Sequence, residues 1–249
     1  ALYSPHVYFE YKIMNKIENG KKFKEIMEKT IEVLLRRHDV LHSFVTVDGQ
    51  MQVVHIEECL KKNFQNVCMV DVRGNDVNNK RMIIRNKMVE NGPDTLNGPV
   101  FDVTFSVCNN HLNDVAWGVI HISISLFVMD GRTERLLREE VSSIFLSLLK
   151  DSSTLEPLLK QYGNKLSFRD YAISSAKISK STEYKNALLY WESRLPDLPS
   201  PPDLPLLNPD IISSEVVHYG GSLDVSRWER IKRLSGSLGT TTTVFLCAV

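Results

Sequence analysis

This sequence of 249 residues has few cysteines, a balance of positive and negative charge, and few long apolar runs. Its four cysteines lie far apart without a CxxC pair, which speaks against a disulfide scaffold or a zinc ribbon and makes a reducing, cytoplasmic location the default. Lys plus Arg and Asp plus Glu each number 30, so the basic excess typical of a nucleic-acid binder is missing. We therefore expect no nucleic-acid partner.

A membrane segment and a signal peptide are not indicated either. The most apolar stretch, residues 116–129, contains His121, Ser123 and Ser125 and is shorter than the ~18 to 20 apolar residues of a spanning helix. The first residues lack a basic region followed by an apolar run, so they do not form a signal peptide. We expect no membrane partner. Because the sequence starts at Ala1 rather than Met, we also expect it to be a piece of a longer protein.

The hydrophobic pattern predicts an α/β fold, with strands and helices following one another along the first 195 residues. Strands are predicted at residues 6–13, 41–47, 51–56, 101–108 and 115–127, and helices at 20–37, 76–91, 132–149 and most of 167–195. Asp48-Gly49 is typical of a hairpin turn between the second and third strands. Within 132–149 only Glu140 interrupts the apolar face.

A proline-dense segment, LPDLPSPPDLPLLNP, follows at residues 195–209 and cannot continue a helix. We predict a first lobe with a mixed sheet at residues 1–195, a linker at 196–213 that lies extended on it, and the beginning of a second lobe at 214–249. In that last part we expect a strand at 216–223, a helix at 225–238 with Trp228, Ile231 and Leu234 inside, and the start of another helix after Thr240. So few elements could not bury a core of their own.

The segment HISISLFVMDGRT, residues 121–133, is the most informative for function. An apolar strand ends there, Asp130-Gly131 forms the turn, and Thr133 suits the cap of the helix that follows. A carboxylate at this place needs a partner or solvent, because burying it alone is costly. Two interpretations stay open: a structural turn residue, or the wall of an active site at the mouth of a cleft.

Two histidines have the i, i+4 spacing of a metal pair. His38 and His42 lie near the end of the helix predicted at 20–37, but the next strand is predicted to begin at Leu41. We therefore favour surface or packing roles for both and predict no metal site.

A set of runs in fixed order carries a resemblance to a known family. The chain resembles the condensation-domain superfamily of nonribosomal peptide synthetases, and within it the heterocyclization domains. The runs that resemble it are SPHVYFEY, VLLRRHDVLHSFVTVDGQMQVV, VDVRG, GPVFDVTFS, HISISLFVMDGRTERLLREEVSSIF, SFRDYA, YWESRLPDLPSPPDLPL and LDVSRWERIKRLSGSLGTTTTVFLCAV. Single runs are weak signals, whereas the ordered set covers nearly the whole chain.

The resemblance implies a layered α/β fold of chloramphenicol-acetyltransferase-like lobes, two of which form a V with a tunnel between them. It implies carrier-to-carrier chemistry, in which an upstream acyl or peptidyl thioester meets the amine of a downstream Cys, Ser or Thr. Heterocyclization domains then close and dehydrate the ring to a thiazoline or oxazoline. The implied partners are the upstream and downstream peptidyl carrier domains and neighbouring synthetase domains. Phosphopantetheine belongs to the carriers, so no directly bound cofactor is expected, and siderophore biosynthesis is an association of the family.

The chain departs from the family at the heterocyclization signature, DxxxxDxxS. Ser125 stands in place of the first acid, Asp130 keeps the second, and Thr133 replaces the final serine. These three are the candidate catalytic positions that the resemblance implies. The family's cyclodehydration residues lie on the second lobe, beyond Val249, so the resemblance also implies that this chain alone cannot complete the cyclization.

The ordinary condensation motif, HHxxxDG, is degenerate in the same segment. Ser125 and Leu126 replace both histidines, and Leu126 can neither accept a proton nor donate a hydrogen bond. Asp130 and Gly131 are kept. The family's arginine that pairs with this aspartate is His42 here, which makes His42 and Gly131 candidate structural positions.

Three hypotheses for function follow. The first is a heterocyclization-like domain with a degenerate site and a scaffolding or carrier-docking role, which would form neither amide nor thiazoline. The second keeps it an enzyme for condensation, since positioning alone can contribute ~7 to 11 kcal/mol. The third is a stand-alone interaction module. For Asp130, either His42 is its partner or it caps the helix that starts near Arg132, and Gly131 and Thr133 favour the cap.

Overall fold

The computed structural model describes residues 5–13, 20–109, 116–151, 153, 155–161, 166–201, 203 and 220–248. The chain divides into two compact units, Ala1–Glu192 and Ser193–Val249, and each is described by itself.

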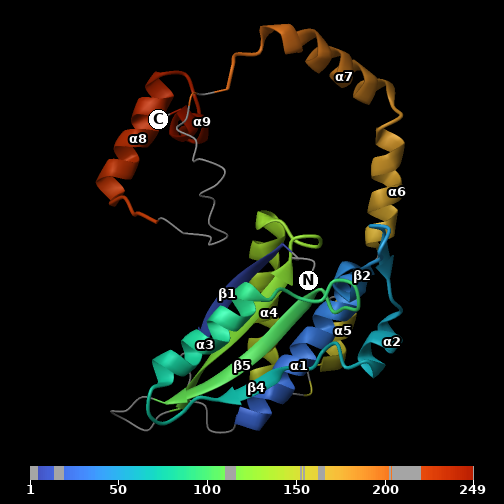
Figure 1. Cartoon of the computed structure of the whole chain (residues 1–249), viewed down its shortest axis with the longest axis vertical. Helices are drawn as coiled ribbons and strands as arrows, with labels where there is room; N and C mark the ends of the chain where they lie inside the picture. The colour runs from blue at the N-terminus through green and yellow to red at the C-terminus, as the bar shows by residue number, and fades with distance from the viewer. Residues whose placement is uncertain are drawn as a thin grey trace, which may run out of the picture. The chain divides into compact units, whose positions relative to one another are not determined.

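The first unit contains a layered α/β body (Figure 1). Its elements are β1 (His6–Ile13), α1 (Gly20–Arg37), the 3-10 turn η1 (Asp39–His42), β2 (Ser43–Val45), β3 (Met51–Val53), α2 (Ile56–Lys61), β4 (Cys68–Asp71), α3 (Val77–Glu90), β5 (Phe101–Asn109), β6 (Ala116–Ser125), α4 (Gly131–Lys150), α5 (Leu155–Gln161), α6 (Phe168–Ile178) and α7 (Thr182–Arg194).

The main sheet has four strands in the order β1-β6-β5-β4. β6 runs antiparallel to both β1 and β5, whereas β4 runs parallel to β5, so the sheet is mixed as predicted. The register places Tyr8 and Asp102 on either side of Ser123, and Glu10 and Thr104 on either side of His121. β2 and β3 pair separately as a short hairpin.

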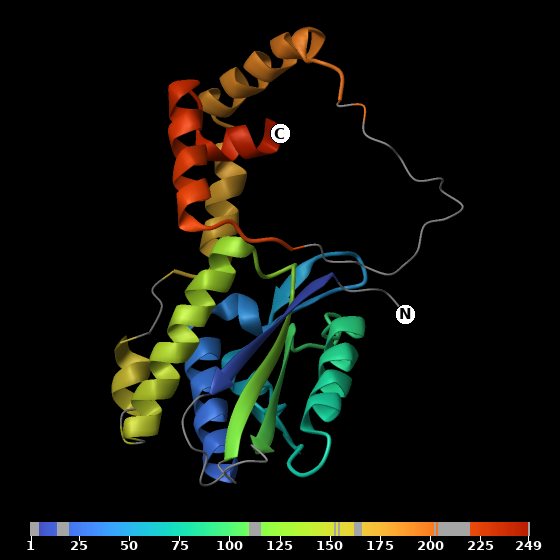
Figure 2. The same ribbon diagram turned by 90° about the vertical axis from the view of Figure 1, so that its left-hand side faces the viewer.

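Helices α1 and α4 cover one face of the sheet and α3 covers the other (Figure 2). Every second residue of β6 faces the α1 and α4 side, where Ile120, Ile122 and Ile124 join the main core. Apolar residues of α1 and α4 recur every three or four positions, which places them along one side of each helix. A smaller cluster under α3 contains Val72, Val77, Cys108 and Val119. The central strand is therefore buried on both faces.

The long periodic elements were predicted correctly, and the differences concern short ones. Leu41 lies in η1 and not in a strand, so β2 begins only at Ser43. β6 ends at Ser125, two positions before the predicted end at Phe127, because the chain turns there. β4, α2 and α5 were not predicted. Residues 110–115, which join β5 to β6, lie outside the described residues.

Helix α6 begins with a capping box that Ser167 and Asp170 form. Its first peptide N–H, on Phe168, donates to both carboxylate oxygens of Asp39, at 3.1 and 2.9 Å. Apolar residues spaced by three or four positions along α7 are exposed: Trp191 is 61% exposed, and Tyr184 and Leu188 are exposed as well.

In the second unit the structure describes the 3-10 turn η3 (Leu195–Asp197), α8 (Val225–Ser237) and α9 (Thr242–Ala248). The expectation that Trp228, Ile231 and Leu234 lie inside is wrong, since Trp228 and Leu234 are exposed and Ile231 is half-buried. Two short helices provide no second layer to cover this face. Most of the predicted linker and the start of the predicted strand, residues 204–219, lie outside the described residues. Residues 220–223 are described and form no strand.

Among the described helices, none combines the length and apolar character needed to cross a membrane. Within the same residues, no three His, Cys, Asp or Glu side chains are grouped as metal ligands would be.

Candidate functional site

Asp130 is the N-cap of α4. Its Oδ1 accepts hydrogen bonds of 2.7 Å from both the peptide N–H and the hydroxyl of Thr133. These hydrogen bonds, above all the one from the peptide N–H of Thr133, hold the pKa of the carboxyl below its ordinary value. Asp130 therefore stays ionised at neutral pH. Gly131 is the first residue of the helix. Of the two alternatives for Asp130, the structure contains the cap, which the sequence favoured.

His42 is not the partner of Asp130. Its ring is buried, and Nδ1 donates to the carbonyl oxygen of Val54 at 2.6 Å. The peptide N–H of Val54 in turn donates to the carbonyl of His42 at 2.9 Å. His42 therefore closes the end of the β2–β3 hairpin, a packing role.

Ser125 and Leu126, which replace the two family histidines, differ in their exposure to solvent. Ser125 is fully buried at the end of β6, and its Oγ accepts the peptide N–H of Phe127 at 3.2 Å. Leu126 is 46% exposed, and it lines the same groove as Asp130 and Thr133. The structure thus brings Leu126, Asp130 and Thr133 together and leaves Ser125 and His42 elsewhere.

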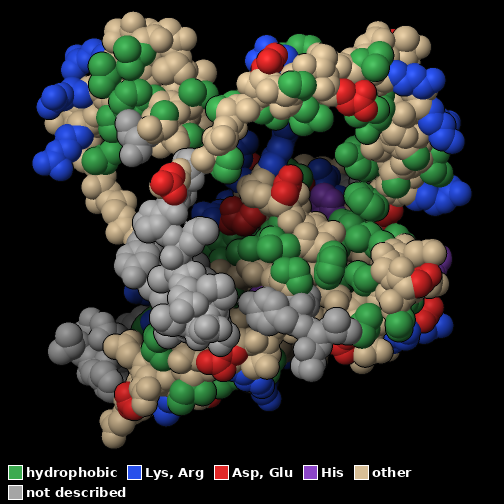
Figure 3. All heavy atoms as spheres, turned by 45° about the horizontal axis from the view of Figure 1, so that its top comes forward, with side chains coloured by type: hydrophobic (Ala, Val, Ile, Leu, Met, Phe, Trp, Pro, Cys, Tyr) green, Lys and Arg blue, Asp and Glu red, His purple; other side chains and the backbone are tan. Residues whose placement is uncertain are grey.

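The groove beside the Asp130 cap has a volume of about 430 Å³. Apolar side chains of the β6–α4 turn, of η1 and of α4 and α6 form most of its lining; they are Val40, Leu41, Leu126, Phe127, Val128, Met129, Leu136, Leu137 and Phe168. The polar members of the lining are His38, Asp130 and Thr133. Hydrophobic side chains with a histidine and carboxylates among them gather on the side of the body that Figure 3 turns toward the viewer.

Beneath this groove a buried carboxylate joins the end of α1 to α4. Glu140 is 6% exposed, and its two oxygens bind Nε of Arg37 at 2.8 Å and Nε2 of His38 at 2.6 Å. A carboxylate oxygen can only accept, so we assign the hydrogen of His38 to Nε2. The sequence analysis missed this cluster, although a single Glu on an apolar helix face and Arg37-His38 at the end of α1 were the signals available.

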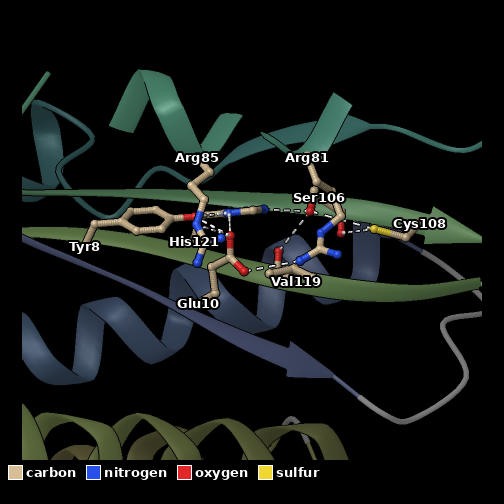
Figure 4. A network of polar contacts seen from close by, with 8 residues as sticks. All are labelled: Tyr8, Glu10, Arg81, Arg85, Ser106, Cys108, Val119 and His121. Carbon is tan, nitrogen blue, oxygen red and sulfur yellow. Dashed lines mark hydrogen bonds and ion pairs between the residues drawn. The ribbon is translucent and has the colours of Figure 1, made fainter. Parts of the chain in front are cut away.

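A second polar cluster lies on the other face of the sheet, under α3 (Figure 4). The Tyr8 hydroxyl donates to Oε1 of Glu10 at 2.7 Å, so Nδ1 of His121 must be the donor in its 2.7 Å bond to that hydroxyl. Nε2 of His121 then accepts the hydroxyl of Ser106 at 2.8 Å. Arg81 binds the other oxygen of Glu10 at 3.2 Å.

Burial dominates the electrostatics of this second cluster. It lowers the pKa of His121 to about 4, which keeps the ring neutral, and it raises the pKa of the Tyr8 hydroxyl, as the neighbouring Glu10 does too. Ser106 and His121 are both fully buried, so a substrate cannot reach them. The cluster therefore holds β1, β5, β6 and α3 together and is not a reaction centre.

Comparison with solved structures identifies the fold. The chain superposes on the EpoB cyclization-docking bidomain from Sorangium cellulosum, a nonribosomal peptide synthetase, with a TM-score of 0.68 and 25% identity over 96% of its length. The chain therefore has the fold of the condensation-type domains of nonribosomal peptide synthetases. The condensation enzyme VibH shares the fold at 12% identity, with a TM-score of 0.55 over 79% of the chain.

Curated relatives of this condensation-type domain are peptide synthetases as well. Bacitracin synthase 1 of Bacillus licheniformis is 24% identical over 225 residues, which are 88% of this chain and 4% of that protein. Pyochelin synthetase PchF of Pseudomonas aeruginosa is 30% identical over 122 residues, 49% of this chain and 6% of that protein. No family model matches the chain. The domain thus spans a small part of these synthetases, and 44% of the EpoB bidomain.

Proposed function

We propose that this chain is a heterocyclization-like domain whose degenerate site leaves it a scaffolding or carrier-docking role in a peptide synthetase. One observation carries the proposal: Asp130, the acid kept from the signature, is used as the cap of α4, and Leu126 stands where a catalytic histidine is expected. Leu126 cannot move a proton, and the carboxylate of Asp130 is engaged in holding the start of α4. The similarity to EpoB, at 25% identity, supports the heterocyclization subfamily.

The proposed partners are peptidyl carrier domains, upstream and downstream, and the neighbouring domains of the same synthetase. Phosphopantetheine would arrive on the carriers, with no cofactor held by the domain itself. A cytoplasmic location and a contribution to siderophore assembly fit the same proposal.

Two measurements test it. Incubated with an acyl-loaded and a Cys-loaded carrier, the chain should give neither the amide nor the product with one water fewer, as read by intact-protein mass spectrometry. An active heterocyclization domain is the positive control. Docking is read separately: the NMR signals of an unloaded, ¹⁵N-labelled carrier should shift in a saturable way when the chain is added. Either product would overturn the degenerate site, and an unperturbed carrier would overturn the docking role.

The second hypothesis, condensation by positioning, has one observation in its favour. The groove beside Asp130 is lined mostly with apolar side chains and has a few polar groups among them, an arrangement typical of small-ligand sites. Amide without ring formation in the same mass-spectrometric assay would favour this hypothesis.

A further inference from the structure

A further groove lies on the first unit, between α3 and the strands at one edge of the main sheet. Its volume is about 490 Å³, a size typical of small-molecule sites, and it shares no residue with the groove beside Asp130. The second half of α3, strands β4 and β5 and the segment after α2 form its walls. It therefore belongs to the α3 face of the sheet, whose polar side chains are drawn in Figure 4.

Two opposite charges line this groove without bonding each other. Asp102 comes from β5 and Lys87 from α3. Burial raises the pKa of the Asp102 carboxyl, while the charges of His6 and Lys87 lower it, so Lys87 lies within electrostatic range of Asp102. Among the described residues, however, neither Asp102 nor Lys87 has a hydrogen-bond or ion-pair partner. Each charge thus faces the groove with its hydrogen-bonding capacity unused.

The rest of the lining selects the ligand. In the described part of the chain no other charged residue lines the groove. A simple cation would be repelled by Lys87 and a simple anion by Asp102, whereas a molecule that carries both charges can bond to both residues. Apolar side chains lie between the polar ones, and they are Phe64, Val70, Ile84 and Met88. A fitting ligand therefore also has an apolar part.

We propose that this groove binds a free amino acid with an apolar side chain, whose ammonium donates to Asp102 and whose carboxylate accepts from Lys87. The side chain of the ligand would then cover Ile84 and Met88 of α3. The inference goes beyond the proposed function and does not rest on it, because neither a carrier nor the groove beside Asp130 takes part.

Three probes with the same phenyl group separate the two charges. L-Phenylalanine carries both, 3-phenylpropanoate lacks only the ammonium, and 2-phenylethylamine lacks only the carboxylate. We expect the whole chain, ¹⁵N-labelled and titrated by NMR at neutral pH, to bind phenylalanine about 10-fold more tightly than either analogue, since each analogue loses one charge-assisted hydrogen bond.

Two variants assign each charge to its residue. Asp102→Asn should lose the preference over 3-phenylpropanoate and keep the preference over 2-phenylethylamine, and Lys87→Gln should do the reverse. Both positions are exposed, so we expect both variants to fold. Lys80→Gln, on the same helix but outside the groove, is the matched control and should change neither preference.

The chain also contains a reporter of where the probe binds. The thiol of Cys68 is exposed and lines the groove, whereas Cys247 is exposed in the second unit and does not line it. Phenylalanine should slow the alkylation of Cys68 by iodoacetamide and leave that of Cys247 unchanged, as read by mass spectrometry of the peptides.

Three results would each overturn this site: equal affinities of the three probes, no binding of phenylalanine, or preferences that survive in both charge variants. Binding without protection of Cys68 would place the amino acid elsewhere and overturn it as well. Carrier docking is measured in its own titration, so failure of the amino-acid site leaves the proposed function standing.

Discussion

At the scale of single residues, the structural role of Asp130 is to cap the N-terminus of α4. Its carboxylate accepts two hydrogen bonds from Thr133, so Asp130→Ala should lower the free energy of unfolding, whereas Asp130→Asn should retain most of it because Asn caps helices equally well. Urea denaturation followed by circular dichroism checks both. Equal losses in the two variants would show that the negative charge matters and not the cap.

His42→Ala tests the packing role that replaced the expected ion pair. It removes a buried ring and leaves the Val54 carbonyl without its donor, so we expect a loss of about 1 to 3 kcal/mol. His42→Asn, which keeps a donor on a shorter side chain, should recover part of it in the same urea denaturation. No loss in the alanine variant would contradict this role for the ring.

Helix packing depends on one charged residue, Glu140 of α4. Glu140→Ala leaves Arg37 and His38 at the end of α1 without their carboxylate, and we expect a loss of about 2 to 3 kcal/mol because both partners are partly exposed. Glu139→Ala is the matched control, since Glu139 lies next to it on the exposed side of the same helix. Equal stabilities of the two variants would show that only apolar contacts hold α1 against α4.

Periodicity explains which elements could be predicted. α1 and α4 have 18 and 20 residues, long enough for several apolar repeats, and both were predicted nearly to their ends. β4, with four residues, and α2, with six, are too short to show a period, and β4 depends on its parallel pairing with β5. Burial was predicted wrongly for Trp228 and Leu234. Their apolar spacing correctly indicates a helix, but it does not show whether another element packs on that side of the helix.

The site could be predicted where its chemistry is local. The cap at Asp130 involves residues three positions apart, and Gly131 and Thr133 indicated it. The bond between His38 and Glu140 spans 102 positions, and the groove joins residues of η1, α4 and α6. No local pattern contains such pairings, so the sequence could not reveal them.

Across the first unit as a whole, acid sensitivity should come from His121. Burial lowers its folded pKa to about 4 from 6.5, so the unfolded chain takes up the proton first. The free energy of unfolding should fall as the pH drops from 6.5 toward 4, by roughly 3 kcal/mol at most, and then level off with respect to this group.

His121→Gln should flatten that part of the curve, whatever it does to stability at neutral pH. The measurement is urea denaturation at a series of pH values, with an exposed histidine variant, His55→Gln, as the control that keeps the slope. The same slope in His121→Gln would mean that other groups cause the acid sensitivity.

The pairing of β1 with β6 also sets the order in which this body can form during synthesis. Tyr8 and His121 are bonded across 113 positions, so β1 has no strand to pair with until residues 116–125 leave the ribosome. At ~5 to 20 residues per second that wait is roughly 6 to 23 s. During it, Val7, Phe9 and Tyr11, which later pack on the core, are exposed on a nascent strand. A chaperone that binds extended apolar segments would therefore find its substrate at the very beginning of this chain.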